Sequence, residues 1–152
     1  MKVSASTINW FVAFKLPSAF LCGVRVKDLR LTACTTTVTH RWINQNPFQS
    51  LYFAVQAMAA ELSTGALLVV KIKESGFEIG MLVTHFEATY TKKAVGKITF
   101  ECVDGLKVAQ TIHNAKETKE RQTVSLKSIG TDSNGAVVSE FIFQWSVKVK
   151  KS

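Results

Sequence analysis

Glu61 is the residue whose type and surroundings point most directly to chemistry. It is the only charged residue between Trp42 and Val70, and that segment contains no histidine. If the segment is a buried helix, desolvation disfavours the charged carboxylate and can raise its pKa by up to roughly 3–5 units. A carboxyl group with a pKa near neutrality can serve as a general base or as a nucleophile. The alternative is a structural role, in which Glu61 pairs with an arginine or lysine from another segment or caps Ser63 and Thr64.

The other residue types that commonly carry chemistry are scattered. They are Cys22, Cys34, Cys102, His40, His85 and His113. The odd cysteine count without C-x-x-C spacing favours neither a disulfide framework nor a zinc site, and the histidines lack metal-ligand spacing. No phosphate-binding loop or dinucleotide fingerprint is present. We therefore expect no metal and no bound cofactor, buried structural thiols at Cys34 and Cys102, and a reducing, cytoplasmic environment.

A long apolar helix must hold Glu61. Pro47 suits a helix start, and Gly65 suits a stop, so the sequence predicts a helix from Pro47 to about Thr64. One stripe of this helix is large and apolar, and the neighbouring stripe is small and ends in the carboxylate. The first stripe is Leu51, Val55, Met58 and Leu62, and the second is Ala54, Ala57 and Glu61.

The remaining segments predict helices at the edges and short strands after the central helix. Apolar spacing predicts a helix over residues 6–16, which Pro17 ends. Residues 24–38 are expected to form one long strand or two broken ones. Further strands are expected over 67–73, 81–91, 97–103, 122–129 and 136–150. A short helix is expected from Leu106 to the charged stretch 116–121. Residues 132–135 predict a hairpin turn. This order predicts an α+β fold in which a curved antiparallel sheet of five to seven strands wraps one helix.

Length and composition favour a single domain over residues 1–152, with 1–22 as a helical segment packed on it. Met1 and Lys2 followed by Ile8 to Leu21 faintly resemble a signal peptide. However, Asn9, Lys15 and Pro17 interrupt the apolar run, so we interpret the segment as a folded amphipathic helix. A hydrophobic fraction of 47% without long apolar runs argues against stable membrane insertion.

The formal charge of +8 favours anionic partners, among them nucleic acid, membrane surfaces and phosphorylated cofactors. The basic residues are spread along the chain and form no nucleic-acid motif, so we expect no nucleic-acid binding. A solvated basic surface is the simplest interpretation.

Several segments resemble the hotdog-fold thioesterase superfamily. In the phenylacetyl-CoA-pathway type, an Asn is followed six residues later by His-Gly-Gly, and an acid follows nine residues after that His; Asn46, Tyr52 and Glu61 have these separations. Asn46-Pro47-Phe48 before a Tyr-Phe-Ala helix, the turn Lys92-Lys93-Ala94 with Gly96, and the terminal stretch 143–148 resemble an uncharacterised branch of the superfamily. The likeness spans nearly the whole chain and implies the hotdog fold.

The resemblance also implies roles for individual residues. Glu61 would activate water at a thioester carbonyl or attack it directly, and Asn46 would position the water or the thioester. The N–H groups of Phe53 and Ala54 would receive the oxyanion at the helix start. Tyr52, Phe53, Ala54 and Ala57 would line the substrate site, and Lys92 and Lys93 would contact the phosphates of an acyl-CoA. A charged, solvated turn is the alternative for the two lysines.

The sequence departs from the well-known enzymes where Tyr52 replaces the histidine and Phe53 adds bulk in place of glycine. The leading hypothesis is an acyl-CoA or acyl-carrier thioesterase acting as a homodimer or homotetramer. A non-catalytic acyl-ligand binder is the second hypothesis. A hydratase or dehydratase is the third, and it would need His85 near the acid.

Overall fold

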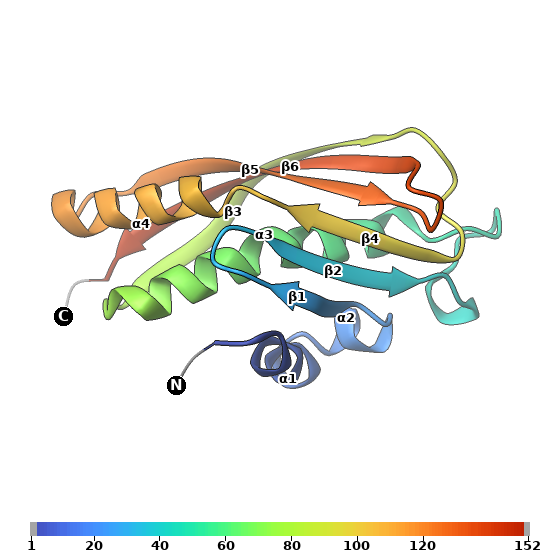
Figure 1. Ribbon diagram of the computed structural model, residues 1–152, viewed down its shortest axis with the longest axis horizontal. Coiled ribbons are helices and arrows are strands. Elements are labelled where there is room, and N and C mark those ends of the chain that lie inside the picture. The colour runs from blue at the N-terminus through green and yellow to red at the C-terminus, as the bar shows by residue number, and fades with distance from the viewer. Residues whose placement is uncertain (1–2, 151–152) are drawn as a thin grey trace.

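The computed structural model describes residues 3–150, which form a six-stranded antiparallel sheet, four α-helices and a 3-10 turn (Figure 1). The helical elements are α1 (Ala5–Lys15), α2 (Pro17–Leu21), η1 (Trp42–Asn44), α3 (Phe53–Ser75) and α4 (Gly105–Thr118). The strands are β1 (Arg25–Leu29), β2 (Cys34–Thr39), β3 (Ile79–Tyr90), β4 (Lys97–Cys102), β5 (Gln122–Thr131) and β6 (Val137–Val149), in the sheet order β1-β2-β4-β5-β6-β3. This arrangement confirms the predicted α+β hotdog class.

The sheet curves around α3, which runs along its concave side (Figure 1). Apolar side chains of α3, among them Val55, Leu62 and Leu68, belong to the same buried core as Phe100 and Phe141 of the strands. Among the described residues α3 alone has the length and mean hydropathy to cross a membrane, yet 67% of that stretch is buried inside the protein. Its apolar character is therefore explained by its position as the core helix.

The predicted bounds of the central helix were wrong at both ends. Pro47 lies in the loop before α3, and the helix continues through Gly65 to Ser75, so residues 67–73 are helical and not a strand. Gly76, with φ of 71°, ends the helix in the left-handed conformation that glycine adopts at least cost. A short apolar run such as the one after Gly65 fits a buried helix as well as a buried strand. In the structure this run continues α3, and most of its residues are buried.

Gly65 serves close packing and does not end the helix. A Cβ atom added there would lie 3.3 Å from the ring of Trp145 on β6, so the missing side chain lets the indole approach the helix. The Trp145 indole N–H also donates to the Thr64 hydroxyl oxygen at 2.9 Å. A glycine inside a helix lowers stability by roughly 1 kcal/mol relative to alanine. At Gly65 the close packing of the Trp145 ring offsets this loss.

The other elements agree with the sequence. Residues 24–38 form most of the two strands β1 and β2. The helix expected over residues 6–16 corresponds to α1, and Pro17 begins the short α2. The hairpin turn at 132–135 joins β5 to β6. Cys34 and Cys102 face each other across β2 and β4 as buried, free thiols, as expected.

Helix α1 covers the open edge of β1. The Asn9 side chain accepts a hydrogen bond from the Val26 N–H at 2.8 Å and donates one to the Val26 carbonyl oxygen at 2.8 Å. One amide side chain therefore supplies the pair of bonds that a neighbouring strand would supply. Covering an edge in this way prevents further strand pairing there.

We expect Gly65→Val to destabilise the protein by about 1–3 kcal/mol, because the new side chain would overlap the Trp145 ring in a packed core. Urea unfolding followed by tryptophan emission measures the change. Lys73→Val, at an exposed position of the same helix, introduces the same side chain without a facing ring. Equal unfolding free energies for the two variants would contradict the packing role of Gly65.

Candidate functional site

A cavity of about 410 Å³ lies at the start of α3. Its lining comes from the loop before α3, the first turns of the helix and the turn after β3. Four residues predicted from the sequence line it: Asn46, Phe53, Lys92 and Lys93. Gln56 and Tyr90 also line it. The fold thus brings together residues from two segments that lie some forty positions apart in the chain.

Asn46 shapes the loop that enters α3. Its Oδ1 accepts hydrogen bonds from the Phe48 N–H at 2.9 Å and the Ser50 N–H at 3.2 Å, and its Nδ2 donates to the Ser50 hydroxyl at 2.9 Å. These bonds form the side-chain turn typical of asparagine. Among the described residues Asn46 makes no hydrogen bond to Glu61, so its predicted role toward water or thioester stays a prediction.

The N-terminus of α3 presents unpaired amide donors. Tyr52 caps the helix without a side-chain hydrogen bond, and its carbonyl oxygen accepts from the Val55 and Gln56 N–H groups. Within residues 3–150, the Phe53 and Ala54 N–H groups have no acceptor. Such groups and the helix dipole favour negative charge at this end. The predicted oxyanion donors are therefore available in this structure.

Glu61 lies two turns further along α3 and is partly buried. Burial raises the pKa of Glu61 to about 7. No lysine or arginine of the described residues forms an ion pair with it, and Thr64 donates to the Glu61 backbone carbonyl oxygen and not to the carboxylate. The structural alternatives for this acid, an ion pair or a local cap, thus have no support in the described residues.

The stripe that carries Glu61 is the least covered side of the helix in this region. Ala54, Ala57 and Glu61 are each partly exposed, whereas Val55, Ala59 and Leu62 are buried. The Glu61 carboxylate points toward Gly65, since its Oε1 would lie 3.4 Å from a Cβ atom there. The small stripe predicted from the sequence is therefore partly exposed beside the acid.

Within one chain, the acid and the amide donors are far apart. A helix rises about 1.5 Å per residue, so Glu61 lies roughly 12 Å along the axis from Phe53. The carboxylate also points away from the helix start. A base, its water and a carbonyl bound to amide donors are linked by contacts of about 3 Å each. The two groups of one chain therefore do not meet at one carbonyl in this conformation.

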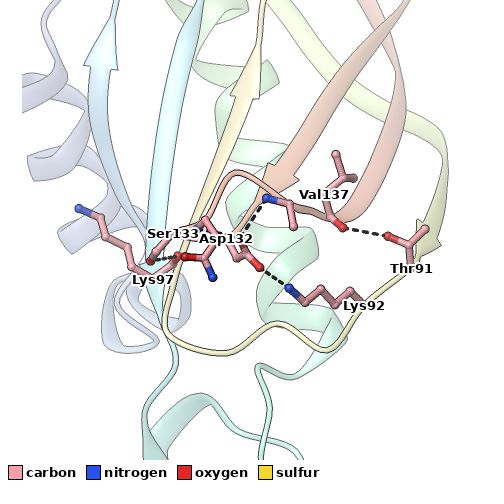
Figure 2. A network of polar contacts seen from close by, with 8 residues as sticks. Thr91, Lys92, Lys97, Asp132, Ser133 and Val137 are labelled. Carbon is pink, nitrogen blue, oxygen red and sulfur yellow. Dashed lines mark hydrogen bonds and ion pairs between the residues drawn. The ribbon is translucent and has the colours of Figure 1, made fainter.

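The lysines differ in their contacts. Lys92 Nζ pairs with the Asp132 carboxylate at 2.6 Å, in the polar network that ties the turn after β3 to the β5–β6 hairpin (Figure 2). The Lys93 ammonium donates to the Phe48 carbonyl oxygen at 3.3 Å, on the rim of the cavity. The interaction with Lys92 and two backbone amides lowers the pKa of Asp132. Lys93 is thus the lysine better placed for a ligand in the cavity.

Sequence reasoning missed Gln56 and Tyr90. Gln56 is buried, and its Oε1 accepts from the Ser139 hydroxyl at 2.8 Å. The Tyr90 hydroxyl donates to the Phe53 carbonyl oxygen at 3.3 Å, and burial raises the pKa of Tyr90. An amide on an otherwise apolar helix was a visible signal for Gln56. Tyr90 gave no such signal, because only the pairing of β3 with β6 brings it to the helix start.

The remaining predicted residues lie near the cavity or on α3 outside its lining. Tyr52 is 44% exposed, and its ring meets the Phe53 ring edge to face with centroids 4.8 Å apart. His85 is an exposed residue of β3 and makes no hydrogen bond to Glu61.

Within residues 3–150, no cluster of His, Cys, Asp or Glu side chains could hold a metal ion.

The sequence profile of DUF4442, a domain of unknown function, matches residues 4–147, and the chain belongs to this family. No curated protein sequence matches it.

The chain is also similar to solved hotdog-fold structures. A Pseudomonas aeruginosa protein of unknown function, described as a probable thioesterase, has a TM-score of 0.85 and 21% identity over 99% of both chains. A Chlorobaculum tepidum protein of unknown function has a TM-score of 0.83 and 15% identity, covering 98% of this chain and 99% of its own. A Haemophilus influenzae thioesterase has a TM-score of 0.74 and 12% identity, covering 98% and 93%. These likenesses confirm the hotdog fold.

We expect Glu61→Gln to change how stability depends on pH. The folded pKa of about 7 lies above the ordinary value of 4.5, so the folded state binds the proton more tightly than the unfolded state. Wild-type stability should therefore decrease as pH rises from about 4.5 to about 7, by at most about 3 kcal/mol from this group. Urea unfolding of both proteins at pH 5 and pH 8 measures the effect. The free energy of unfolding of the variant relative to the wild type should be higher at pH 8 than at pH 5. A constant difference would contradict the raised pKa.

Proposed function

We propose that the protein is a thioester hydrolase acting on acyl-CoA or acyl-carrier thioesters, with Glu61 as the general base or nucleophile. The observation that carries this proposal is an acid without an ion-pair partner among residues 3–150, with a pKa of about 7, on the partly exposed stripe of the core helix. A group with that pKa is half deprotonated near neutral pH and can accept a proton from water. The thioesterase described among the structural neighbours supports the substrate class.

In the proposed reaction the acyl carbonyl lies against the α3 N-terminus, where the Phe53 and Ala54 N–H groups stabilise the developing oxyanion. A carboxylate takes a proton from water as the water attacks the carbonyl, and the thiolate of the carrier leaves. If Glu61 attacks directly, it forms an anhydride that water then cleaves. Asn46 holds the loop that shapes the entrance, and Tyr52, Ala54 and Ala57 border the acyl group. Lys93, with Lys92 behind it, attracts the carrier phosphates.

The separation of base and amide donors along α3 favours a site built from two chains. The acid of one subunit would then face the helix start of the other. Strand β3 offers the contact, because it pairs with β6 on one side and no strand of the described residues pairs with its other side. Its exposed Leu82, Phe86 and Tyr90 are apolar. An uncovered twelve-residue edge can pair with a second copy, and a two-fold axis repeats the contact.

We further propose that residues 1–152 act as a single hotdog domain in the cytoplasm and assemble into a homodimer or homotetramer. The free, buried Cys34 and Cys102 support a reducing compartment. The proposal includes no metal, cofactor or nucleic acid.

A non-catalytic acyl-ligand binder is the second candidate. It is favoured by the half-exposed Phe53, which occupies the helix start where the known enzymes have glycine, and by the engagement of Asn46 with its own loop. Tight binding of an acyl-CoA without turnover would support this candidate over the enzyme.

We expect Glu61→Gln to lower kcat for acyl-CoA hydrolysis by about 10²–10⁴ with little change in KM, because the amide cannot accept the proton. In the wild type, kcat/KM should rise with pH through about pH 7 as the carboxyl loses its proton. Glu74→Gln changes an exposed acid of the same helix and should leave both unchanged. Full activity of Glu61→Gln would exclude this residue as the base.

Leu82→Lys should weaken subunit association at least tenfold, because it places a charge on the open β3 edge of each of two chains that already carry +8. Light scattering over a concentration series measures the molecular mass. Leu106→Lys on α4, at a position 74% exposed, is the matched control. A wild-type protein that stays monomeric at all concentrations would contradict the two-chain site.

A further inference from the structure

Large apolar side chains project into solvent on one border of the molecule. They belong to α1, α2 and η1, which follow one another along the lower border in Figure 1. We call this group the aromatic edge: Trp10 (65% exposed), Phe14 (73%), Leu21 (63%), Trp42 (84%) and Ile43 (52%). Exposed apolar residues are ordinary when single, but several large ones on successive elements along one border of the molecule point to an interaction site.

The segments of the aromatic edge are held together by specific contacts. The Asn44 side chain donates to the Cys22 carbonyl oxygen at 2.8 Å, which joins η1 to the end of α2. The Arg41 guanidinium lies against Gly23, in the space that a Cβ atom at position 23 would occupy. Leu16 both ends α1 and caps α2. The group is therefore a fixed surface and not a set of independent loops.

Helix α1 is apolar on both its inner and its outer side. Ile8 and Val12 are buried against the protein, and Asn9 bonds to β1. On the outer side the Trp10 and Phe14 rings stack on each other with centroids 5.7 Å apart. A helix that is apolar on its inner side alone would suffice for packing on β1, so the outer side requires a separate explanation.

Cations border the aromatic edge. Lys15 ends α1, Arg41 precedes η1, and Arg25 lies over the Phe20 ring of α2, 3.7 Å from its centroid. No carboxylate of the described residues is within ion-pair distance of any of the three. Burial and the nearby charge of Arg41 lower the pKa of Arg25, so the two guanidinium groups are neighbours. Arg25 Nη1 donates to the Phe20 and Val24 carbonyl oxygens at 2.9 and 2.8 Å, which fixes this guanidinium beside the rings. Positive charge without a carboxylate partner among the described residues, next to exposed rings, fits an anionic partner.

We propose that the aromatic edge docks the protein on the surface of an anionic lipid bilayer, with the rings at headgroup depth and the three cations against lipid phosphates. Tryptophan is enriched at this depth, and lysine and arginine near the surface are attracted by anionic headgroups. Reversible binding of this kind needs both an apolar and a basic component, and both are present here.

A second copy of the chain fits this surface less well. A two-fold contact through the aromatic edge would enclose Lys15, Arg25 and Arg41 of both subunits in one interface. The aromatic edge and its three bordering cations include no carboxylate, so this interface between two chains of +8 would gather like charges without an opposite charge. A lipid surface instead supplies the opposite charge over the whole area.

Sedimentation with vesicles tests the proposal. Wild-type protein should bind vesicles of three parts phosphatidylcholine to one part phosphatidylglycerol at least tenfold more tightly than pure phosphatidylcholine vesicles. Added salt at 0.5 M should remove most of this difference because it screens the charges. Absence of binding to the anionic vesicles, or equal binding to both kinds, would overturn the proposal.

Variants locate the contact. Trp10→Ser with Phe14→Ser should reduce binding at least tenfold, and Arg41→Glu should reduce binding to anionic vesicles alone. The matched controls are Leu106→Ser and Lys148→Glu, which make the same kinds of change on α4 and β6. If the controls lose as much binding as the test variants, or if the test variants change only the oligomeric mass, the aromatic edge is not a lipid surface.

Tryptophan quenching in the wild type needs no variant. Trp10 and Trp42 are exposed, whereas Trp145 is 4% exposed in the core. Brominated lipids in the anionic vesicles should quench the emission of the two exposed indoles and leave a residual core emission. Sedimentation with the vesicles without quenching would place the contact elsewhere and overturn the proposal.

Discussion

The fold depends on burying a long helix that still carries polar side chains. Each buried polar group of α3 has a partner that other segments supply: Ser63 bonds to Ser128 at 2.8 Å, Thr64 receives the Trp145 indole N–H, and Gln56 bonds to Ser139. From the sheet side, the Thr36 hydroxyl donates to the Ala59 carbonyl oxygen at 2.6 Å. These bonds make burial compatible with polarity, since unpaired polar groups would each cost about 1–3 kcal/mol. Glu61 is the exception on this helix, an acid with no ion-pair partner in the described chain, and burial raises its pKa to about 7.

The two edges of the sheet have different surroundings. At β1 the edge is covered by α1, through the two bonds that Asn9 makes to Val26. At β3 nothing in the described chain covers the edge. The same side of the molecule that gains a protective helix also gains the aromatic edge, because the outer side of that helix has no partner in the fold. The proposed assembly surface and the proposed lipid surface thus lie at opposite ends of the strand order and do not compete for the same residues.

Much of the fold could be predicted because its signals are local. The turn at 132–135, the alternation along residues 136–150 and the Pro17 boundary all depend on near neighbours. One error lay at Gly65, where a residue that commonly ends a helix instead lets Trp145 approach. That role depends on a residue eighty positions away, and no local pattern reveals it. The bonds of Gln56 and the approach of Tyr90 to Phe53 were missed for the same reason.

By itself, the sequence determined that a lone acid lies on an apolar helix beside small residues, because the composition of residues 42–70 leaves no other charge there. It also determined the α+β order of elements, since periodicity and turn residues act over short distances. Only the tertiary structure decided that no cation of the described part of the chain pairs with Glu61 and that its carboxylate points away from the amide donors. It also decided that Lys92 is engaged by Asp132 while Lys93 borders the cavity. These are properties of contacts between distant segments, and the chain acquires them when the sheet closes around the helix.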